Sequence, residues 1–233
     1  MKAIILAAGR GSRLGALTKD VPKCLVEYKS RTLLEHNLEN LRRYFDDSDI
    51  TVVGGYRNEL LTKYHSNIVI NDAWDRTNII GSLQVCDNQL LESDCLIIYS
   101  DIYYHHSAIR QMLDTEPPAI LNLVNFIEIW KSRFANPLED LETFVLSKEM
   151  NNLVEIGKKP KSKSEIQGQF GGIFSLNPAT WKKILRSIPN PQAMDTTSLI
   201  NNALKLNIDF RVVNYSSYWA EFDSPDDITN QKF

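Results

Sequence analysis

Cysteines and long apolar runs are scarce in this chain of 233 residues, and neither sign of charge dominates it. The three cysteines, Cys24, Cys86 and Cys95, have no paired spacing, and an odd number is typical of a reducing compartment. No apolar stretch approaches the length of a membrane span, and the first residues lack the pattern of a secretory signal. A net charge of -3 gives no basic surface for nucleic acid. We therefore expect a cytoplasmic monomer or homodimer with no nucleic-acid and no membrane partner.

The chain does contain alternating strand-like and helix-like segments. Hydrophobic residues make up 43% of it, which is enough for one α/β domain or a domain with an appendage. In the first half, we expect strands at 3–5, 50–55, 67–71 and 95–99 and helices at 33–41, 59–61 and 79–91. Such repeated units predict an α/β fold with a doubly wound, mainly parallel sheet flanked by helices. Because ligands bind beyond the carboxyl ends of the strands, the loops after Leu6, Val53, Ile70 and Tyr99 should line one site.

The second half has a less regular pattern. Strands are expected at 119–124, 171–176, 210–213 and 219–223, helices at 178–186 and 196–206, and a hairpin from 144–146 and 153–157. The sheet should therefore be mixed, and the second half should add a small β-containing region.

The segment after the first strand is the most informative part of the sequence. It reads Leu6-Ala7-Ala8-Gly9-Arg10-Gly11-Ser12-Arg13-Leu14 and is followed by Val21-Pro22-Lys23. Its small residues let backbone N–H groups approach an anion closely, and glycine tolerates the positive φ angles of such a loop. Arg13 as a planar fork and Lys23 as a point charge can reach the same anion. This combination predicts a polyphosphate-binding loop and hence a nucleotide enzyme.

Two well-known phosphate loops do not match this segment. The P-loop requires Gly-Lys followed by Ser or Thr, but Gly11-Ser12-Arg13 stands here and Lys23 lies far downstream. The dinucleotide-binding fingerprint requires a third glycine where Leu14 stands. The simpler alternative is a strand that ends in a plain glycine turn.

The full pattern, with Arg13 and Pro22-Lys23, closely resembles the signature of the nucleotidyltransferases that activate sugar phosphates and phosphocholine. The resemblance implies a Rossmann-like nucleotidyltransferase fold over 1–233, with a nucleotide-binding half at 1–115 and an acceptor-binding half at 116–233. It also implies nucleotide contacts from the loop and from two later segments. These residues are Leu6, Ala7, Ala8, Gly9, Gly11, Ser12, Gly55, Tyr56, Asn78 and Ser82. For Ser82, a capping role just inside a helix is the alternative.

Two aspartates close strands on the expected ligand side of the sheet. Asp101 follows the strand at 95–99, and Asp223 ends the run Trp219-Ala220-Glu221-Phe222. Mg²⁺ prefers phosphate oxygens together with one or two carboxylates. The resemblance implies that Asp101 and Asp223 are the metal ligands and that, with Arg13 and Lys23, they form the catalytic set. Ordinary loop and N-cap aspartates are the alternative.

The region after residue 128 combines aromatic rings, an arginine and several carboxylates. Arginine suits a phosphate, whereas carboxylates and aromatic faces suit an ammonium group. The region resembles that of cytidylyltransferases acting on small phosphorylated or phosphonate amino compounds, including the phosphoglutamine enzyme of capsule phosphoramidate pathways. The acceptor-binding residues expected from this are Trp130, Arg133, Glu139, Asp140, Glu142 and Lys159. A solvated acidic loop with one buried tryptophan is the alternative.

These expectations combine into one predicted reaction. A phosphate of a phosphocholine-like or phosphoglutamine-like acceptor attacks the α-phosphorus of CTP with Mg²⁺ bound, and pyrophosphate leaves. Sugar-1-phosphate nucleotidyl transfer is a second possibility, although Lys158 stands where sugar enzymes carry a glutamate. A nucleotide-binding regulatory subunit without activity is a third, although the four expected catalytic residues are intact.

Overall fold

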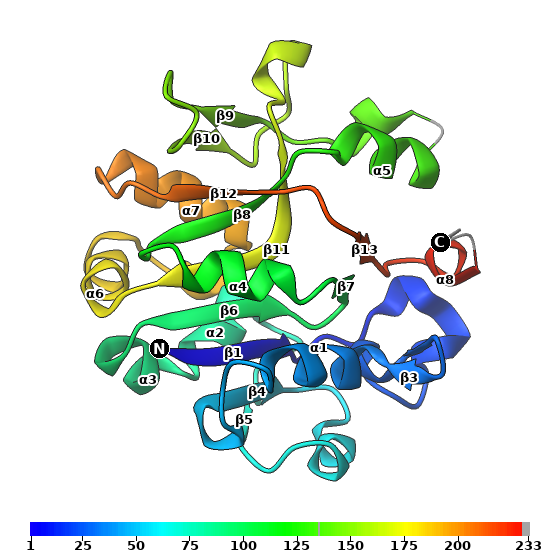
Figure 1. The fold of residues 1–233 in the computed structure, drawn as a ribbon. Helices are drawn as coiled ribbons and strands as arrows, with labels where there is room; N and C mark the ends of the chain where they lie inside the picture. Colours follow the sequence, from blue (N-terminus) through cyan, green and yellow to red (C-terminus); the bar gives the residue numbers. More distant parts are fainter. Residues whose placement is uncertain (135, 230–233) are drawn as a thin grey trace.

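A central sheet of seven strands organises the computed structural model, which describes residues 1–134 and 136–229 (Figure 1). In spatial order, the strands are β12 (Arg211–Tyr215), β8 (Ala119–Leu123), β11 (Gln169–Leu176), β6 (Cys95–Tyr99), β1 (Lys2–Ala7), β4 (Ile50–Gly54) and β5 (Ile68–Ile70). Only β11 runs antiparallel to its neighbours, β6 and β8, whereas the other pairs are parallel. The expectation of a mixed, mainly parallel sheet is confirmed.

Helices cover both faces of this sheet because the side chains of its strands alternate in direction. In β1, Ala3 and Ile5 belong to one hydrophobic cluster, and Ile4 and Leu6 belong to another. The first cluster includes residues of α1 (Leu33–Leu41), α4 (Ser107–Leu113) and α5 (Phe126–Arg133). The second includes residues of α2 (Ile79–Gln84), α3 (Asp87–Glu92), α6 (Pro178–Ser187) and α7 (Thr196–Lys205). Both clusters draw on both halves of the chain.

The helices are short and have defined starts. The side chains of Thr32, Asn177 and Asp195 accept backbone N–H groups at the starts of α1, α6 and α7, respectively. Among the described residues, the longest helices are α6 and α7, with 10 residues each. Within the described residues, none of the helices has the length and apolar character needed to cross a membrane.

Smaller elements extend from the sheet. Three two-stranded ribbons pair β2 (Glu27–Tyr28) with β3 (Arg31–Thr32), β7 (Ile102–Tyr104) with β13 (Trp219–Glu221), and β9 (Phe144–Leu146) with β10 (Leu153–Ile156). The helix α8 (Pro225–Thr229) follows β13. Short 3₁₀ helices occupy connections: η1 (Ser12–Thr18), η2 (Lys23–Leu25), η3 (Asp47–Asp49), η4 (Asn58–Lys63), η5 (Pro137–Glu139), η6 (Lys163–Glu165) and η7 (Pro191–Ala193).

The structure differs from the sequence-based expectations in three places. The helix expected at 79–91 is interrupted at Cys86, whose ψ of 19° departs from the helical value, so α2 and α3 are separate. The helix expected at 59–61 is a 3₁₀ helix. The helix α5 and the strand β7 were not expected; three residues are too few for a periodic signal, and β7 forms only by pairing with the distant β13.

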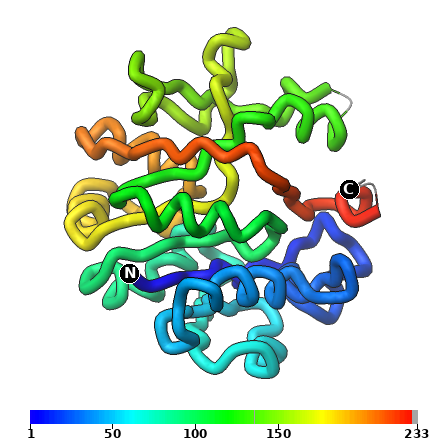
Figure 2. The backbone as a smooth tube through the Cα atoms, in the orientation of Figure 1, coloured from blue at the N-terminus to red at the C-terminus, as the bar shows by residue number. Residues whose placement is uncertain are grey.

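The last segment of the chain returns to the first loop. Figure 2 shows the red C-terminal stretch leaving β12 and running to the blue N-terminal region at the carboxyl end of β1. Leu14 and Phe222 belong to one small hydrophobic cluster there. This contact brings the loop after β1 and Asp223 to the same edge of the sheet.

Candidate active site

The loop after β1 folds back on itself at Gly11. This glycine has a φ of 73°, and a Cβ at its position would lie 2.8 Å from Cβ of Lys23. The Thr18 hydroxyl donates to the Gly11 carbonyl over 2.8 Å, and the Lys23 backbone N–H donates to the Gly9 carbonyl over 3.3 Å. Only a residue without a side chain fits here, and this fit places Lys23 against the loop.

A cavity of about 280 Å³ opens beside this loop. It is lined by Leu6, Ala8, Gly9, Lys23, Trp74, Thr77, Asn78, Ile79, Ser82, Tyr99, Ser100 and Asp101. Five of the predicted nucleotide contacts are therefore in its wall, whereas the described lining does not include Ala7, Gly11, Ser12, Gly55 or Tyr56. The sequence analysis missed Trp74 and Thr77, which lie in a loop without a periodic pattern.

The Gly55-Tyr56 step supports the cavity from behind. A Cβ on Gly55 would lie 2.6 Å from Cβ of Trp74 and 2.7 Å from the Ala8 carbonyl oxygen. The Tyr56 backbone N–H donates to that same carbonyl over 3.0 Å, and the Tyr56 hydroxyl donates to the carbonyl of Lys19. The absence of a side chain at position 55 thus allows the Trp74 wall to close against the first loop.

Three carboxylates converge at the end of the cavity that Lys23 and Asp101 line. Asp101, Glu221 and Asp223 each offer an oxygen, and these atoms lie within 4.8 Å of one another. The β7–β13 ribbon brings them together, since Ile102 pairs with Glu221 and the Phe222 N–H donates to the Asp101 carbonyl over 3.0 Å. Glu221 was not predicted, although its spacing of two from Asp223 places both on one face of an extended segment.

Lys23 lies between two of these carboxylates. Its Nζ donates to Asp101 Oδ2 and to Asp223 Oδ1, each over 2.5 Å. Burial alone lowers the pKa of the Lys23 ammonium, but the negative charges of Asp101 and Asp223 outweigh it, so this pKa is raised above its usual value. The ammonium therefore stays protonated at neutral pH and acts as a fixed cation.

Arg13 approaches the same cluster from outside. Its Nη2 donates to Asp223 Oδ1 over 2.9 Å, and 76% of its side chain is exposed. The structure thus brings the four predicted catalytic residues together, with Lys23 inside the cluster and Arg13 at its rim.

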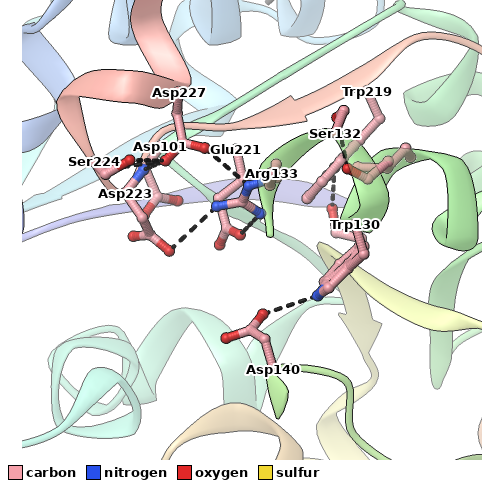
Figure 3. A network of polar contacts seen from close by, with 12 residues as sticks. Asp101, Trp130, Ser132, Arg133, Asp140, Trp219, Glu221, Asp223, Ser224 and Asp227 are labelled. Atoms are coloured by element: carbon pink, nitrogen blue, oxygen red, sulfur yellow. Dashed lines mark hydrogen bonds and ion pairs between the residues drawn. The ribbon is translucent and has the colours of Figure 1, made fainter. Parts of the chain in front are cut away.

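Arg133 faces the carboxylates from the side of α5 (Figure 3). Its Nε donates to Asp227 Oδ1 over 2.9 Å, and its Nη1 donates to Glu221 Oε2 over 2.8 Å. Its Nη2 lies 3.7 Å from Asp223 Oδ2 and makes no hydrogen bond within the described residues. Only 7% of this side chain is exposed, so the guanidinium is part of a buried charge network.

Burial and like charge act together on Glu221. Burial raises the pKa of this carboxyl to about 7, and the neighbouring charge of Asp223 raises it as well, whereas Arg133 opposes both. Glu221 therefore takes up a proton more readily than an ordinary glutamate.

The other residues expected to bind the acceptor fall into two groups. Trp130 is buried, stacks on Trp219 with a ring-centroid distance of 6.1 Å, and donates from Nε1 to Asp140 Oδ2 over 2.8 Å (Figure 3). Glu139 and Lys159 are exposed, and the Lys159 ammonium donates to the carbonyls of Leu138 and Glu139. Trp130 thus contacts both Arg133 and Asp140, whereas Asp140, Glu139 and Lys159 are all exposed.

Glu142 is partly buried on the same side of the molecule. Burial raises the pKa of its carboxyl, a hydrogen bond with Thr197 opposes the shift, and the charges of Asp195 and Asp140 add to it. Asp140, Glu142 and Asp195 therefore form a region of negative potential that suits a cationic group.

The residues present fit a divalent cation. Asp101 Oδ1 is buried and has no hydrogen-bond partner among the described residues, although buried polar atoms are normally paired. It belongs to a set of three carboxylates, and carboxylate oxygens are the ligands that Mg²⁺ prefers.

Comparisons with known proteins identify the family of this chain. Residues 3–123 match the model of the MobA-like NTP transferase domain. The chain is 32% identical to CTP:phosphoglutamine cytidylyltransferase of Campylobacter jejuni, with 99% of both chains covered. It is 29% identical to a bifunctional sugar-1-phosphate nucleotidylyltransferase/acetyltransferase of Sulfurisphaera tokodaii over 97% of this chain and 53% of that one, so it spans about half of that relative.

A solved structure shares the fold. CTP:phosphocholine cytidylyltransferase from Streptococcus pneumoniae superimposes with a TM-score of 0.68 at 20% identity, covering 97% of this chain and 95% of that one. The resemblance noted in the sequence is confirmed. This chain belongs to the MobA-like NTP transferase family and is an enzyme of the nucleotidyltransferase class.

Proposed function

We propose that this enzyme is an Mg²⁺-dependent cytidylyltransferase that transfers CMP from CTP to the phosphate of a small phosphorylated or phosphonate amino compound. The observation that carries the proposal is Lys23, whose Nζ contacts Asp101 and Asp223 over 2.5 Å at one end of the cavity. Full-length similarity to a phosphoglutamine cytidylyltransferase supports the choice of CTP and acceptor. The buried, free cysteines agree with a cytoplasmic enzyme.

In this proposal, the nucleotide lies along the wall formed by Leu6, Ala8, Gly9, Asn78 and Ser82, with its phosphates toward Lys23. Asp101, Glu221 and Asp223 would hold Mg²⁺, which when bound neutralises charge on phosphate oxygens. Residues 1–115 would supply the nucleotide site and residues 116–233 the acceptor site, within one domain.

The chemistry requires positioning and charge stabilisation more than proton transfer. An acceptor phosphate is largely ionised at neutral pH because its second pKa is about 6. One of its oxygens attacks the α-phosphorus of CTP, a new P–O bond forms, and the bond to the β-phosphate oxygen breaks to release pyrophosphate. Lys23, protonated, stabilises the α-phosphate and the incoming oxyanion, and Arg13 stabilises the leaving pyrophosphate.

Acceptor recognition is assigned to the carboxylates and Arg133. The Nη2 of Arg133 has no hydrogen-bond partner among the described residues and lies beside Asp223, so it can donate to the acceptor phosphate. Asp140 and Glu142 would pair the acceptor ammonium, with Trp130 holding Asp140 in place and Glu139 and Lys159 at the entrance.

A sugar-1-phosphate nucleotidyltransferase is the second candidate, favoured by the Sulfurisphaera relative. Lys158, which stands where sugar enzymes carry a glutamate, forms an ion pair with Glu155 and is exposed. This arrangement leaves no carboxylate at that position for a sugar hydroxyl.

A pyrophosphate-release screen tests the proposal. CTP, UTP, dTTP and GTP are each combined with phosphocholine, phosphoglutamine, an aminoalkyl phosphonate, glycerol phosphate and glucose-1-phosphate. We expect turnover with CTP and an amine-bearing acceptor. Faster turnover with glucose-1-phosphate than with every amino compound would favour the sugar reaction, and no turnover with any pair would favour a binding subunit.

A further inference from the structure

Asn71, directly after β5, lies behind the nucleotide cavity and is only 3% exposed. Its Oδ1 accepts the Ala73 backbone N–H over 3.0 Å, and its Nδ2 donates to Thr77 Oγ1 over 3.1 Å and to Ser82 Oγ over 3.0 Å. A backbone N–H can only donate, so the carbonyl oxygen of the amide must face Ala73. The two amide hydrogens must then face the two hydroxyls, and the orientation of the Asn71 amide is fixed.

Because both hydroxyls accept a hydrogen bond from Asn71, the Thr77 and Ser82 hydrogens must point away from Asn71. The Thr77 hydroxyl donates to the Ala73 carbonyl over 2.9 Å and accepts from Asn71. Ser82 Oγ also accepts from Asn71, and no group among the described residues accepts its hydrogen. Because Ser82 lines the cavity, its free O–H donor is available to a ligand there.

Ser82 is held in place as well as oriented. It lies in the first turns of α2, next to Gly81, where a Cβ would lie 2.4 Å from Cβ of Thr77. The start of α2 therefore packs against Thr77 without intervening space. Asn71 contacts both Thr77 and Ser82 and couples the end of β5 to the wall of the cavity.

The two pyrimidine bases differ in what they offer to such a donor. The N3 atom of cytosine is a hydrogen-bond acceptor, whereas N3 of uracil carries a hydrogen. We propose that Asn71 is a positioning residue that makes the cavity select cytosine over uracil. Its amide N–H occupies one lone pair of the Ser82 oxygen, so the Ser82 O–H cannot point back at Asn71 and is directed into the cavity as a donor to N3. This inference rests on the proposed function, because it takes CTP as the nucleotide.

Asn71→Asp tests the inference with almost no change in shape. The carboxylate still accepts the Ala73 N–H, but it now accepts the Ser82 hydrogen as well, so Ser82 presents only lone pairs to the cavity. Dissociation constants for CTP and UTP are measured by calorimetry with MgCl₂ at pH 8. We expect the wild type to bind CTP about tenfold more tightly than UTP, as one hydrogen bond implies, and this ratio to fall to about one or below in the variant.

Ser82→Ala provides an independent route to the same answer. It should also lower the CTP/UTP preference, and Asn71→Asp added to Ser82→Ala should cause no further change. Asn67→Asp is the matched control, because Asn67 donates to Ile50 O and Thr51 Oγ1 ahead of the opposite end of β5 and should leave the ratio unchanged. Thermal midpoints report whether each variant is folded.

Two results contradict the role of Asn71. One is that Asn71→Asp weakens the binding of CTP and UTP equally. The other is that Asn71→Asp changes the CTP/UTP ratio as much in the Ser82→Ala background as in the wild type. Should Asn71→Asp not fold, an unchanged ratio in Ser82→Ala overturns the inference. A wild type that prefers UTP contradicts the proposed function instead, so the two failures are distinguishable.

Discussion

Lys23 Nζ lies 2.5 Å from Asp101 Oδ2, although 78 positions separate the two residues in the sequence. The same ammonium contacts Asp223, 200 positions away. Lys23 and a bound divalent cation would therefore share two carboxylates. The positive charge of each would reduce the repulsion between these carboxylates. Lys23 and the carboxylate cluster are therefore electrostatically coupled.

Replacing Lys23 with methionine should lower kcat more than it weakens CTP binding. A preorganised cation beside a developing oxyanion contributes about 3 kcal/mol of transition-state stabilisation, so we expect a loss of roughly 100-fold in kcat. Steady-state kinetics with varied CTP measure the effect, and Lys19→Met, an exposed lysine of the same connection, is the control. An effect confined to KM would make Lys23 a ground-state anchor.

Asp101→Asn and Asp223→Asn should abolish turnover while the fold is retained. Each removes one of the three carboxylates that suit a divalent cation. We expect MgCl₂ to raise the thermal midpoint of the wild type and to leave that of either variant nearly unchanged. Asp226→Asn, an exposed acid of α8, should behave like the wild type. Wild-type turnover in Asp101→Asn or Asp223→Asn would show that the metal assignment is wrong.

Arg133→Met should destabilise the protein strongly. The change leaves the buried Asp227 carboxylate and the partly exposed Glu221 carboxyl without their arginine partner, at a cost of about 3–5 kcal/mol. Urea unfolding measures the loss, and Lys131→Met on the exposed face of α5 is the control.

The conservative change Arg133→Lys separates structure from acceptor binding. It keeps the charge but not the planar fork, so part of the stability should return while the acceptor KM stays raised and the CTP KM stays normal. A normal acceptor KM in this variant would restrict Arg133 to a structural role.

Glu142 should give acceptor binding a pH dependence. Burial raises the pKa of its carboxyl in the folded state, so it ionises at a higher pH than an exposed glutamate. The acceptor KM should therefore fall as the pH rises through the range in which Glu142 ionises, because the ionised form pairs the ammonium. The acceptor phosphate also ionises, with a second pKa of about 6, so Glu142→Gln should reduce this pH dependence rather than remove it.

The raised pKa of Glu142 also determines whether the stability of the protein rises or falls with pH. A raised folded-state pKa means that the contribution of Glu142 to stability is greatest below the unfolded value of about 4.3 and is lost as the pH rises through the folded value. Relative to Glu142→Gln, the wild type should lose stability from pH 4 to 7 in urea titrations. A constant difference between the two would contradict the shift.

Sequence patterns identified the parts of this molecule that depend on local periodicity. The helix expected at 33–41 and the strand expected at 95–99 have the same bounds as α1 and β6. Both are indicated by the pattern of apolar residues within one continuous segment. Asp101 and Asp223 were predicted as site residues because each follows a strand and matches the family resemblance, and the structure places them in one cluster. In contrast, β7 and Glu221 depend on pairing between segments far apart in the chain, and no local period indicates which segments meet.

The part of the cavity wall formed by α2 and the loop before it shows the same limit of prediction from sequence. Asn78 and Ser82 were predicted from a motif, but Asn71 and Trp74 act through tertiary contacts that the sequence does not display. The setting of Arg133 among three carboxylates likewise follows from the docking of α5 near β13 and α8, not from its neighbours in sequence.

The position of β13 near the end of the sequence determines the order in which the parts of the site are synthesised. Every described residue that lines the nucleotide cavity lies between Leu6 and Asp101, so the ribosome has produced them all before the chain is half complete. Glu221 and Asp223 are among the last residues to emerge. A nascent or truncated chain that ends before Trp219 carries the cavity lining and Lys23 but only one carboxylate of the cluster. The C-terminal segment therefore completes the carboxylate cluster, and under the proposed function a chain without it would keep the cavity but lack the full metal site.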